Sequence, residues 1–223
     1  MQHDSGMPKA VIFDIDGTLV DSNEFHVRAW REVFLRHGKD VPLEAIRPQM
    51  GKGGDQLMPV FWPQADLARF GDEMQEERVR LFIEKYLPRV RAFPGVRELF
   101  ERLRADGVRI ALASSARKPE LEHHLRTLGV RDLVEGVTSA DDADHSKPCP
   151  DILQAALGRL PGVAARDVVV VGDSPYDGQA AARAGMKFVG VLTGGFTEEE
   201  LRKAGAIAVY RELAELIGEP AWT

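Results

Sequence analysis

Residues 10–22 read AVIFDIDGTLVDS, and this stretch decides the fold class. An apolar run rich in β-forming residues leads directly into two carboxylates, Asp14 and Asp16, which stand one residue apart. A glycine and the hydroxyl of Thr18 follow them. Like charges this close repel each other, so a strand that ends on both carboxylates indicates that something binds them there. The stretch therefore predicts a strand with a functional site at its carboxyl end.

Other short apolar runs have the composition of buried strands. The sequence VVVV at 168–171 is typical of a strand that is covered by helices on both faces, as parallel sheets are. The predicted strands are residues 10–15, 108–113, 167–172 and 187–192, with a weaker candidate at 133–139 and a short one at 206–210.

Helical patterns separate these strands. Pro119 in a first turn, leucines at 121, 125 and 128, and then Gly129 predict a helix with a start, an apolar stripe and a stop. Similar spacing recurs at residues 95–107, 150–160 and 176–185. Strand and helix therefore alternate from about residue 95 onward. This alternation predicts an α/β fold with a doubly wound, mostly parallel, Rossmann-like sheet and helices on both faces.

Residues 21–88 interrupt the alternation. Asp21 or Ser22 is placed to cap a helix that carries an apolar face, and a charged amphipathic run follows at about 71–87. We interpret this segment as an all-helical insertion. The predicted organisation is an α/β core domain made of residues 1–20 and 89–223, with a helical domain at 21–88.

Composition and charge exclude several classes of function. A net charge of −6 argues against nucleic acid or an anionic membrane as the main partner. The single cysteine, Cys149, excludes an internal disulfide and a cysteine-rich metal site. The segment MQHDSGMPKA lacks the apolar centre of a secretory signal, and no apolar run reaches the roughly 18 residues of a spanning helix. We therefore expect a cytoplasmic protein, whose oligomeric state the sequence leaves open.

Chemically competent side chains follow the main predicted strands. Ligands of open α/β sheets bind beyond the carboxyl ends of the strands, so these positions should converge on one edge. The positions are Asp14 and Asp16 after the first strand, Ser114 and Ser115 after the second, Lys147 before the helix at 150–160, and Asp173 and Asp177 after VVVV.

Such a cluster could bind Mg²⁺ and a phosphoryl group. Asp14 and Asp173 offer the oxygen ligands that Mg²⁺ takes, and Lys147 adds a fixed positive charge. A carboxylate held against phosphorus can attack it to form an aspartyl-phosphate. A second carboxyl two residues further on can protonate the leaving oxygen and later activate water.

At these residues the sequence resembles the haloacid dehalogenase (HAD) superfamily of phosphohydrolases. FDIDGTLVDS is similar to the first motif of that superfamily, ALASS to the second, SKPCPD to the third and VVVVGDSPYD to the fourth. The resemblance covers almost the whole chain. The helical insertion is similar to the cap domain of the phosphoglycolate phosphatase and β-phosphoglucomutase branch.

The resemblance implies a role for each motif residue. It makes Asp14 the nucleophile and Asp16 the general acid/base. The metal would be held by the side chains of Asp14 and Asp173, by the backbone carbonyl of Asp16, and by Asp177 directly or through water. Phosphate binding falls to the motif residues Ser114, Ser115 and Lys147.

Two features distinguish between the activities found within this superfamily. Asp16 argues against dehalogenation, because dehalogenases lack the second aspartate. Thr18 stands where the mutase has valine, and this favours a hydrolase. His26 matches a mutase histidine that couples cap closure to acid/base action, but its place on an apolar helix face equally fits a packed side chain. We therefore leave His26 out of the catalytic set.

The segment MGKGGDQLM, residues 50–58, is the expected specificity element of the cap. Our candidate specificity residues are Arg47 and Lys52, with Arg117 as a further candidate just past the second motif. His123, His124 and His145 lack metal-ligand spacing, so surface or loop positions are expected for them.

The sequence as a whole predicts a Mg²⁺-dependent phosphatase that acts on a small phosphorylated metabolite. The main alternative is a phosphosugar mutase, which transfers the phosphoryl group to a bound sugar instead of water. A second alternative is a non-catalytic phosphate-binding module resembling a receiver domain. The identity of the substrate stays open.

Overall fold

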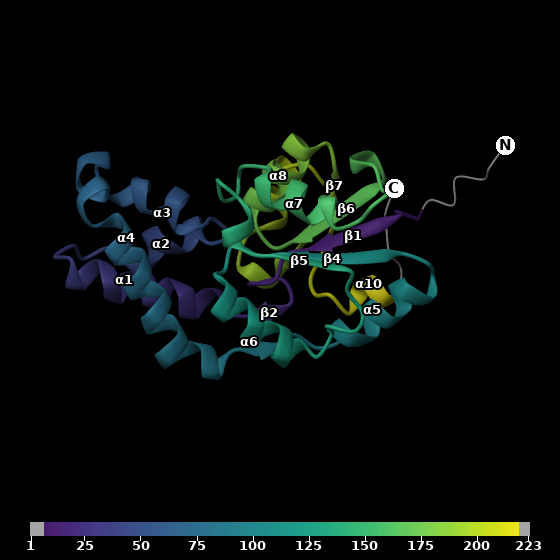
Figure 1. Ribbon diagram of the computed structural model, residues 1–223, viewed down its shortest axis with the longest axis horizontal. Helices are drawn as coiled ribbons and strands as arrows, with labels where there is room; N and C mark the ends of the chain where they lie inside the picture. The colour runs from purple at the N-terminus through teal and green to yellow at the C-terminus, as the bar shows by residue number, and fades with distance from the viewer. Residues whose placement is uncertain (1–6, 219–223) are drawn as a thin grey trace.

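The computed structural model describes residues 7–218. Its central feature is a parallel sheet that helices cover on both faces (Figure 1). The first six residues, part of the segment expected to carry no secretory signal, lie outside this range. The six strands pair in the order β5-β4-β1-β6-β7-β8, and every pairing is parallel. They are β1 (Ala10–Phe13), β4 (Arg109–Ala113), β5 (Gly136–Thr138), β6 (Val168–Gly172), β7 (Lys187–Val191) and β8 (Ala206–Tyr210).

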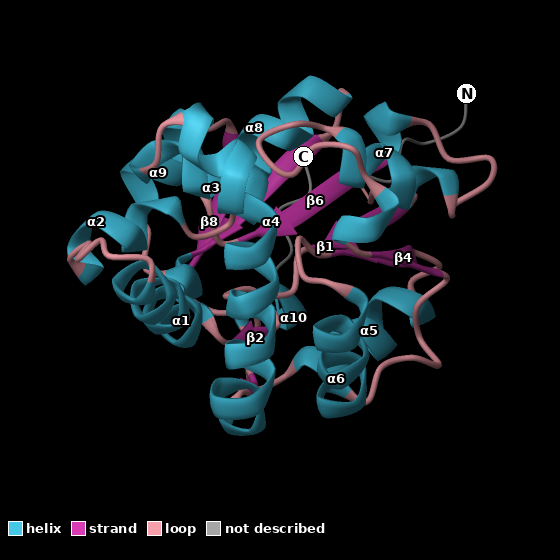
Figure 2. Cartoon of the chain, turned by 60° about the vertical axis from the view of Figure 1, so that its left-hand side comes forward, coloured by secondary structure: helices cyan, strands magenta, loops and turns pink. Residues whose placement is uncertain are grey.

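The sheet is buried on both sides because alternate residues of each strand face different helices. In β1, Val11 and Phe13 join one apolar cluster, whereas Ala10 and Ile12 join another. The first cluster includes Leu99 of α5 and the leucines of α6, and the second includes side chains of α7 and α8. Figure 2 shows these helices as layers on opposite sides of the strands. The predicted doubly wound α/β fold is confirmed.

The helices of the layers follow the strands closely in sequence. They are α5 (Val96–Ala105), α6 (Lys118–Leu128), α7 (Asp151–Gly158), α8 (Pro175–Ala184), α9 (Glu198–Lys203) and α10 (Glu215–Gly218). Each of the four helices predicted between residues 95 and 185 forms within a few residues of its expected bounds.

Between residues 22 and 89 the regular structure is helical, with short 3-10 turns at Arg47–Gln49 and Leu87–Arg89 beside four α-helices. The α-helices are α1 (Asn23–Arg36), α2 (Leu43–Ile46), α3 (Gly54–Phe61) and α4 (Gln64–Leu81), and α4 continues into a π-helical turn at Phe82–Tyr86. We call α1–α4 the inserted helices. Figure 1 shows them beyond the carboxyl ends of the sheet strands, on the side away from the N-terminus.

A two-residue antiparallel ribbon joins the inserted helices to the sheet. Strand β2 (Val20–Asp21) pairs with β3 (Arg91–Ala92), so the chain leaves and re-enters the sheet region at one place. The sequence did not predict this ribbon, because two residues are too few to show a period.

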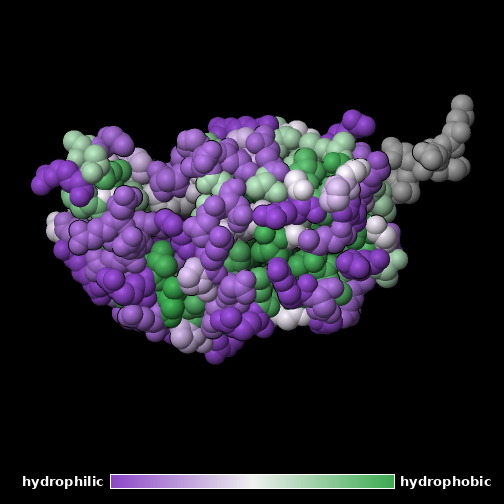
Figure 3. All heavy atoms as spheres, in the orientation of Figure 1, coloured by the Kyte–Doolittle hydropathy of each residue, from purple (hydrophilic) through white to green (hydrophobic). Residues whose placement is uncertain are grey.

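The surface seen in Figure 3 is mostly hydrophilic, with apolar side chains gathered in patches. Within residues 7–218 the exposed large apolar side chains are Leu35, Val60 and Ile207, which lie on different elements. No helix in that range is long and apolar enough to cross a membrane.

Candidate active site

The site lies at the carboxyl end of β1, which is the strand where the sheet order changes direction: β4 and β5 lie on one side of it, and β6, β7 and β8 lie on the other. Strands β4 and β6 flank β1, and residues at the carboxyl ends of these parallel strands therefore meet. Phe13 pairs with Val171, and the backbone N–H of Asp14 donates to the carbonyl of Val171. This register brings Asp14 beside Asp173, which follows β6.

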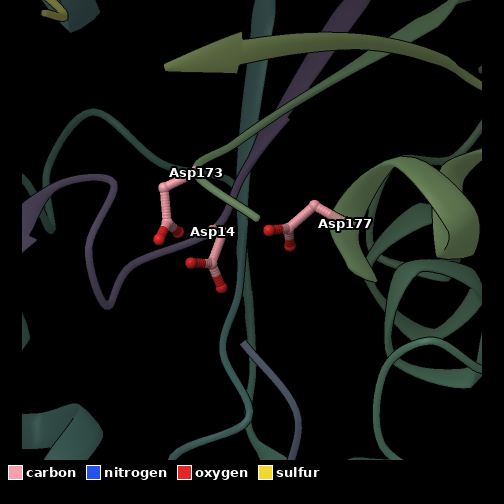
Figure 4. A group of neighbouring side chains, drawn as sticks. All are labelled: Asp14, Asp173 and Asp177. Atoms are coloured by element: carbon pink, nitrogen blue, oxygen red, sulfur yellow. The ribbon is translucent and has the colours of Figure 1, made fainter. Parts of the chain in front are cut away.

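Three carboxylates converge at this point. Oxygen atoms of Asp14, Asp173 and Asp177 all lie within 4.8 Å of one another, and all three residues are buried. Figure 4 shows the three side chains pointing toward one another, with Asp14 and Asp173 from the ends of β1 and β6 and Asp177 from the first turn of α8. We call these residues the aspartate cluster.

Lys147 reaches this cluster from the loop before α7. Its Nζ donates to Oδ1 of Asp14 and, over 2.7 Å, to Oδ1 of Asp177. The lysine side chain is only 1% exposed, so these carboxylates replace its hydration. Ser174 fixes the other oxygen of Asp177, because its hydroxyl and backbone N–H both donate to Oδ2. Ser174 is therefore a helix cap that also orients Asp177.

The pKa values of the cluster reflect burial and mutual repulsion. Burial raises the pKa of Asp14 to about 7, although the charge of Lys147 opposes this rise. Burial, and then the negative charge of Asp14, hold the pKa of Asp173 well above its usual range. The pKa of Lys147 is raised because Asp14 and Asp177 outweigh the effect of burial.

The cluster has the properties of a divalent-cation site. One ammonium group cannot neutralise three buried carboxylates. Carboxylate oxygens are the ligands of hard cations such as Mg²⁺. The residues present therefore fit a divalent metal ion.

Two neutral side chains contact the carboxylate oxygens of Asp173. Asn23, the first residue of α1, donates from Nδ2 to Asp173 Oδ2 over 2.9 Å, and Thr18 Oγ1 lies 3.0 Å from Asp173 Oδ1. Gly17 lies under this contact with φ of +78°, and a Cβ there would collide with Asp173 Oδ2. Sequence reasoning missed Asn23, which carries no motif of its own.

The side chain of Asp16 has partners of its own outside the aspartate cluster. Its Oδ1 accepts a 2.7 Å hydrogen bond from the hydroxyl of Ser22 and lies 3.0 Å from His26 Nε2. Its Oδ2 lies 3.3 Å from the hydroxyl of Ser114. The expectation that Ser22 caps α1 through its side chain is wrong, because Asp16 takes the hydroxyl instead.

Two histidines set the charge of Asp16. His124 Nε2 also lies 3.2 Å from Asp16 Oδ1. Burial acts to raise the pKa of Asp16, but the charges of His124 and His26 outweigh it and hold that pKa well below its usual range. The pKa of His124 is raised, because Asp16 outweighs burial.

The expected surface position of His124 is wrong, because the residue is fully buried in α6. The spacing of leucines around His124 could have predicted that it is buried. His124 stands three residues after Leu121 and four before Leu128, on the apolar stripe of the helix.

A cavity of about 50 Å³ lies between the inserted helices and the sheet. Asp14, Asp16, Lys52 and Ser115 line it, and the buried Oγ of Ser115 has no hydrogen-bond partner within residues 7–218. Trp30, His26 and Arg78 complete the side that the inserted helices contribute.

The three specificity candidates lie in different surroundings. Lys52 faces the cavity, where its Nζ donates to Gln49 Oε1 over 2.6 Å. Arg47 and Arg117 do not line this cavity. Arg47 pairs with Glu24, and Arg117 pairs with Asp141, at half-exposed positions.

Comparison with known proteins places these residues in a family. The family model for haloacid dehalogenase-like hydrolases matches residues 11–191, which include the aspartate cluster, Asp16 and Lys147. The chain is 33% identical over 219 residues to a phosphoglycolate phosphatase of Rhodospirillum rubrum, and the match covers 94% of this chain and 90% of that protein.

Further relatives differ in how much of their length is matched. A phosphorylated carbohydrates phosphatase of Thermotoga maritima is 31% identical, with 91% of this chain and 94% of that protein covered. The protein SUPPRESSOR OF QUENCHING 1, chloroplastic, of Arabidopsis thaliana is 30% identical over 96% of this chain, which spans only 20% of that longer protein.

Solved structures agree with the sequence matches. A hydrolase from Pseudomonas syringae superposes with a TM-score of 0.83 at 28% identity, with 94% of this chain and 96% of that chain covered. The fold and the family that the motifs indicated are therefore confirmed.

Proposed function

Because this chain belongs to the haloacid dehalogenase-like hydrolase family and is a phosphatase, we propose that it hydrolyses a small phosphorylated metabolite with Mg²⁺ as its cofactor. The observation that carries the proposal is the convergence of the aspartate cluster with Lys147 at the carboxyl edge of the sheet. Few structural needs call for three buried carboxylates and one lysine, whereas binding of a metal and a phosphate calls for both.

We assign the covalent step to Asp14. One of its carboxylate oxygens attacks phosphorus, the bond from phosphorus to the leaving oxygen breaks, and an aspartyl-phosphate forms. Lys147 holds Asp14 by a charged hydrogen bond and adds positive charge where the phosphoryl oxygens would lie. Mg²⁺, held by Asp14, Asp173, Asp177 and the backbone carbonyl of Asp16, would supply the charge that keeps Asp14 ionised and balances the phosphoryl group.

Asp16 is the proposed general acid and base. In its protonated form, which the neighbouring histidines disfavour, its carboxyl delivers a proton to the departing alcohol. The carboxylate that results then takes a proton from the water that cleaves the aspartyl-phosphate. Ser22, His26 and His124 fix its position through the contacts with Oδ1. Ser115 Oγ, which faces the cavity without a partner, is placed to donate to a phosphoryl oxygen, and Ser114 braces Asp16.

The inserted helices act as a cap in this proposal, with a cap domain at residues 21–88 and a core domain at 1–20 and 89–223. A cavity of about 50 Å³ holds only a few water molecules, so a metabolite enters when the cap moves away from the sheet. The β2–β3 ribbon is the proposed hinge, because only two chain segments cross there. Closure then excludes bulk water during the transfer.

Small phosphoesters are the proposed substrate class. Relatives are named as phosphatases of phosphoglycolate, of phosphorylated carbohydrates and of validoxylamine A 7'-phosphate. Of the three specificity candidates, Lys52 is the one placed to meet such a substrate, because Arg47 and Arg117 do not line the cavity.

The test is release of inorganic phosphate from a panel of phosphorylated metabolites, with Mg²⁺ and with EDTA. We expect turnover that requires Mg²⁺ and that is lost in Asp14→Asn and Asp16→Asn. Wild-type turnover in either variant would show that the assigned roles are wrong. Sustained turnover of an aryl phosphate by the wild type would also exclude a phosphate-binding module without activity.

A phosphosugar mutase is the second candidate, and the contact of His26 with Asp16 favours it. The same covalent step would then be followed by transfer to a bound sugar. A coupled assay decides between the two. Isomerisation of a hexose phosphate that outpaces phosphate release would identify a mutase, and the reverse would identify a hydrolase.

A further inference from the structure

Two buried residues of α6 reach the site although no motif includes them. Glu120 and His124 stand four residues apart, so they lie on one face of the helix, and both are fully buried. Glu120 contacts the inserted helices through Arg78, and His124 contacts Asp16. One helix of the sheet layers therefore touches both the movable part of the molecule and the proposed acid/base.

The contact of Glu120 with Arg78 is a buried ion pair. Nη1 of Arg78 lies 3.2 Å and 3.1 Å from the two carboxylate oxygens, and the side chains are 6% and 0% exposed. The guanidinium also lies over the rings of Trp30 and Phe82. A buried charge that loses its partner is strongly unfavourable, so this pair holds α4 against α6 as long as the inserted helices stay closed.

Arg78 occupies a position where the helical pattern calls for an apolar residue. The buried face of α4 runs through Gly71, Met74, Arg78 and Leu81. A charged residue within such a stripe is a sequence signal for a specific buried partner. Glu120 is that partner, and both residues line the cavity.

Arg78 also connects back to Asp16 through His26. Its Nη1 lies 3.5 Å from His26 Nδ1. The other ring nitrogen of His26, Nε2, lies 3.0 Å from Asp16 Oδ1. Stacking of the His26 ring on Phe82, with centroids 3.9 Å apart, fixes the ring plane.

These contacts close a ring that joins the two parts of the molecule. It runs from Glu120 to Arg78, His26, Asp16 and His124, and the three residues of α6 between Glu120 and His124 complete it. Neither ring nitrogen of His124 has a well-aligned hydrogen bond within residues 7–218, although Nε2 lies close to Asp16. Contacts of this kind often tighten only when substrate is bound.

We propose that Glu120 and His124 are positioning residues that couple closure of the inserted helices to the orientation of Asp16. The proposal rests on the function proposed above. Glu120 acts through Arg78 and sets how firmly the inserted helices close. His124 acts on Asp16 from the sheet layers, opposite His26, so that the carboxyl is clamped from both sides only when the protein is closed.

Leaving-group dependence tests the role of His124. The experiment compares kcat/KM of wild type and His124→Asn for an alkyl phosphomonoester from the metabolite panel and for 4-nitrophenyl phosphate. The alkyl leaving group needs a proton from Asp16, whereas 4-nitrophenolate leaves without one. We expect a loss of roughly 10- to 100-fold for the alkyl ester, within the range of general acid catalysis, and a much smaller loss for the aryl ester. His123→Asn, on the neighbouring position, should change neither.

A double-mutant cycle tests the role of Glu120. Glu120→Gln should raise KM and lower kcat/KM for both substrates, because closure weakens whatever the leaving group. Arg78→Gln should do the same, and the double variant should lose no more than either single variant, since each single change already breaks the pair. Glu122→Gln, an exposed change on the same helix, is the control and should behave as wild type.

The outcomes separate this inference from the proposed function. A wild type without activity on any phosphoester would overturn the function and the inference together. If the wild type is active but His124→Asn lowers kcat/KM equally for the two substrates, or for neither of them, the inference alone is overturned. Additive losses at Arg78 and Glu120 would also overturn the inference alone. If circular dichroism shows His124→Asn to be unfolded, His124→Gln is judged by the same ratio.

Discussion

Replacement of Lys147 with methionine probes the electrostatics of the site in the absence of metal. The change keeps most of the apolar stem and removes the ammonium that Asp14 and Asp177 share. Because both carboxylates are buried, water cannot replace the lost charge. We expect a large loss of stability, measured with EDTA present.

The magnitude follows from the burial of the pair. Removal of one partner from a buried ion pair costs about 3–5 kcal/mol in the free energy of unfolding. In a chain of this size, about 1 kcal/mol lowers Tm by about 2–4 °C, so Lys147→Met should lower Tm by about 6–20 °C. Turnover should also fall by roughly 100- to 1,000-fold, the effect of removing one transition-state donor.

The loss of stability caused by Lys147→Met should grow with pH. Lys147 opposes the rise in the pKa of Asp14 that burial causes, so without the lysine this pKa lies further above that of the unfolded chain. A carboxyl with a raised pKa in the folded state stabilises the fold below its unfolded pKa, and this stabilisation is lost as pH rises through the folded pKa. The difference in Tm between wild type and variant should therefore be larger at pH 8 than at pH 5.

Lys9→Met is the matched control. Lys9 pairs with Asp167 over 2.8 Å, almost the distance from Lys147 to Asp177, but its side chain is 65% exposed. A surface pair contributes about 0–1 kcal/mol, so the control should lower Tm by less than about 4 °C. Thermal unfolding followed by circular dichroism gives both values. Equal shifts in the two variants would refute the reasoning from burial.

Two further outcomes follow from the aspartate cluster. Mg²⁺ should raise the Tm of the wild type more at pH 8 than at pH 5, because burial raises the pKa of Asp14 to about 7 and the cation needs the ionised form. The control is NaCl at matched ionic strength, and an equal Mg²⁺-dependent shift at both pH values would contradict the expectation. Gly17→Ala should abolish the Mg²⁺-dependent shift in Tm and lower turnover, because the φ of Gly17 is +78° and an added Cβ collides with Asp173 Oδ2. Thermal unfolding measures the shift and phosphate release measures turnover. A variant that keeps the full shift would show that Asp173 is not a ligand.

Most of the fold could be predicted because local patterns specify it. The VVVV run, the apolar stripe of α6 and the glycines that end helices each satisfy a rule that needs no knowledge of distant residues. The parts that were missed are those without a period or a motif. The β2–β3 ribbon is too short to show alternation, and Ser22 follows a capping pattern but gives its hydroxyl to Asp16.

The sequence by itself determined the parallel sheet, the helical insertion and the convergence of Asp14, Lys147 and Asp173 at one edge. It could do so because parallel strands present their carboxyl ends together, whatever lies between them in the chain.

Only the tertiary structure decided the surroundings of Asp16. His26 comes from an inserted helix and His124 from a helix that covers the sheet. Both rings contact the same oxygen of Asp16, and nothing in the sequence around either histidine predicts this. Arg78 and Glu120 are 42 residues apart in the chain, and they are partners because the inserted helices pack against α6. Contacts across two separately packed parts depend on how those parts dock, and no local pattern specifies that.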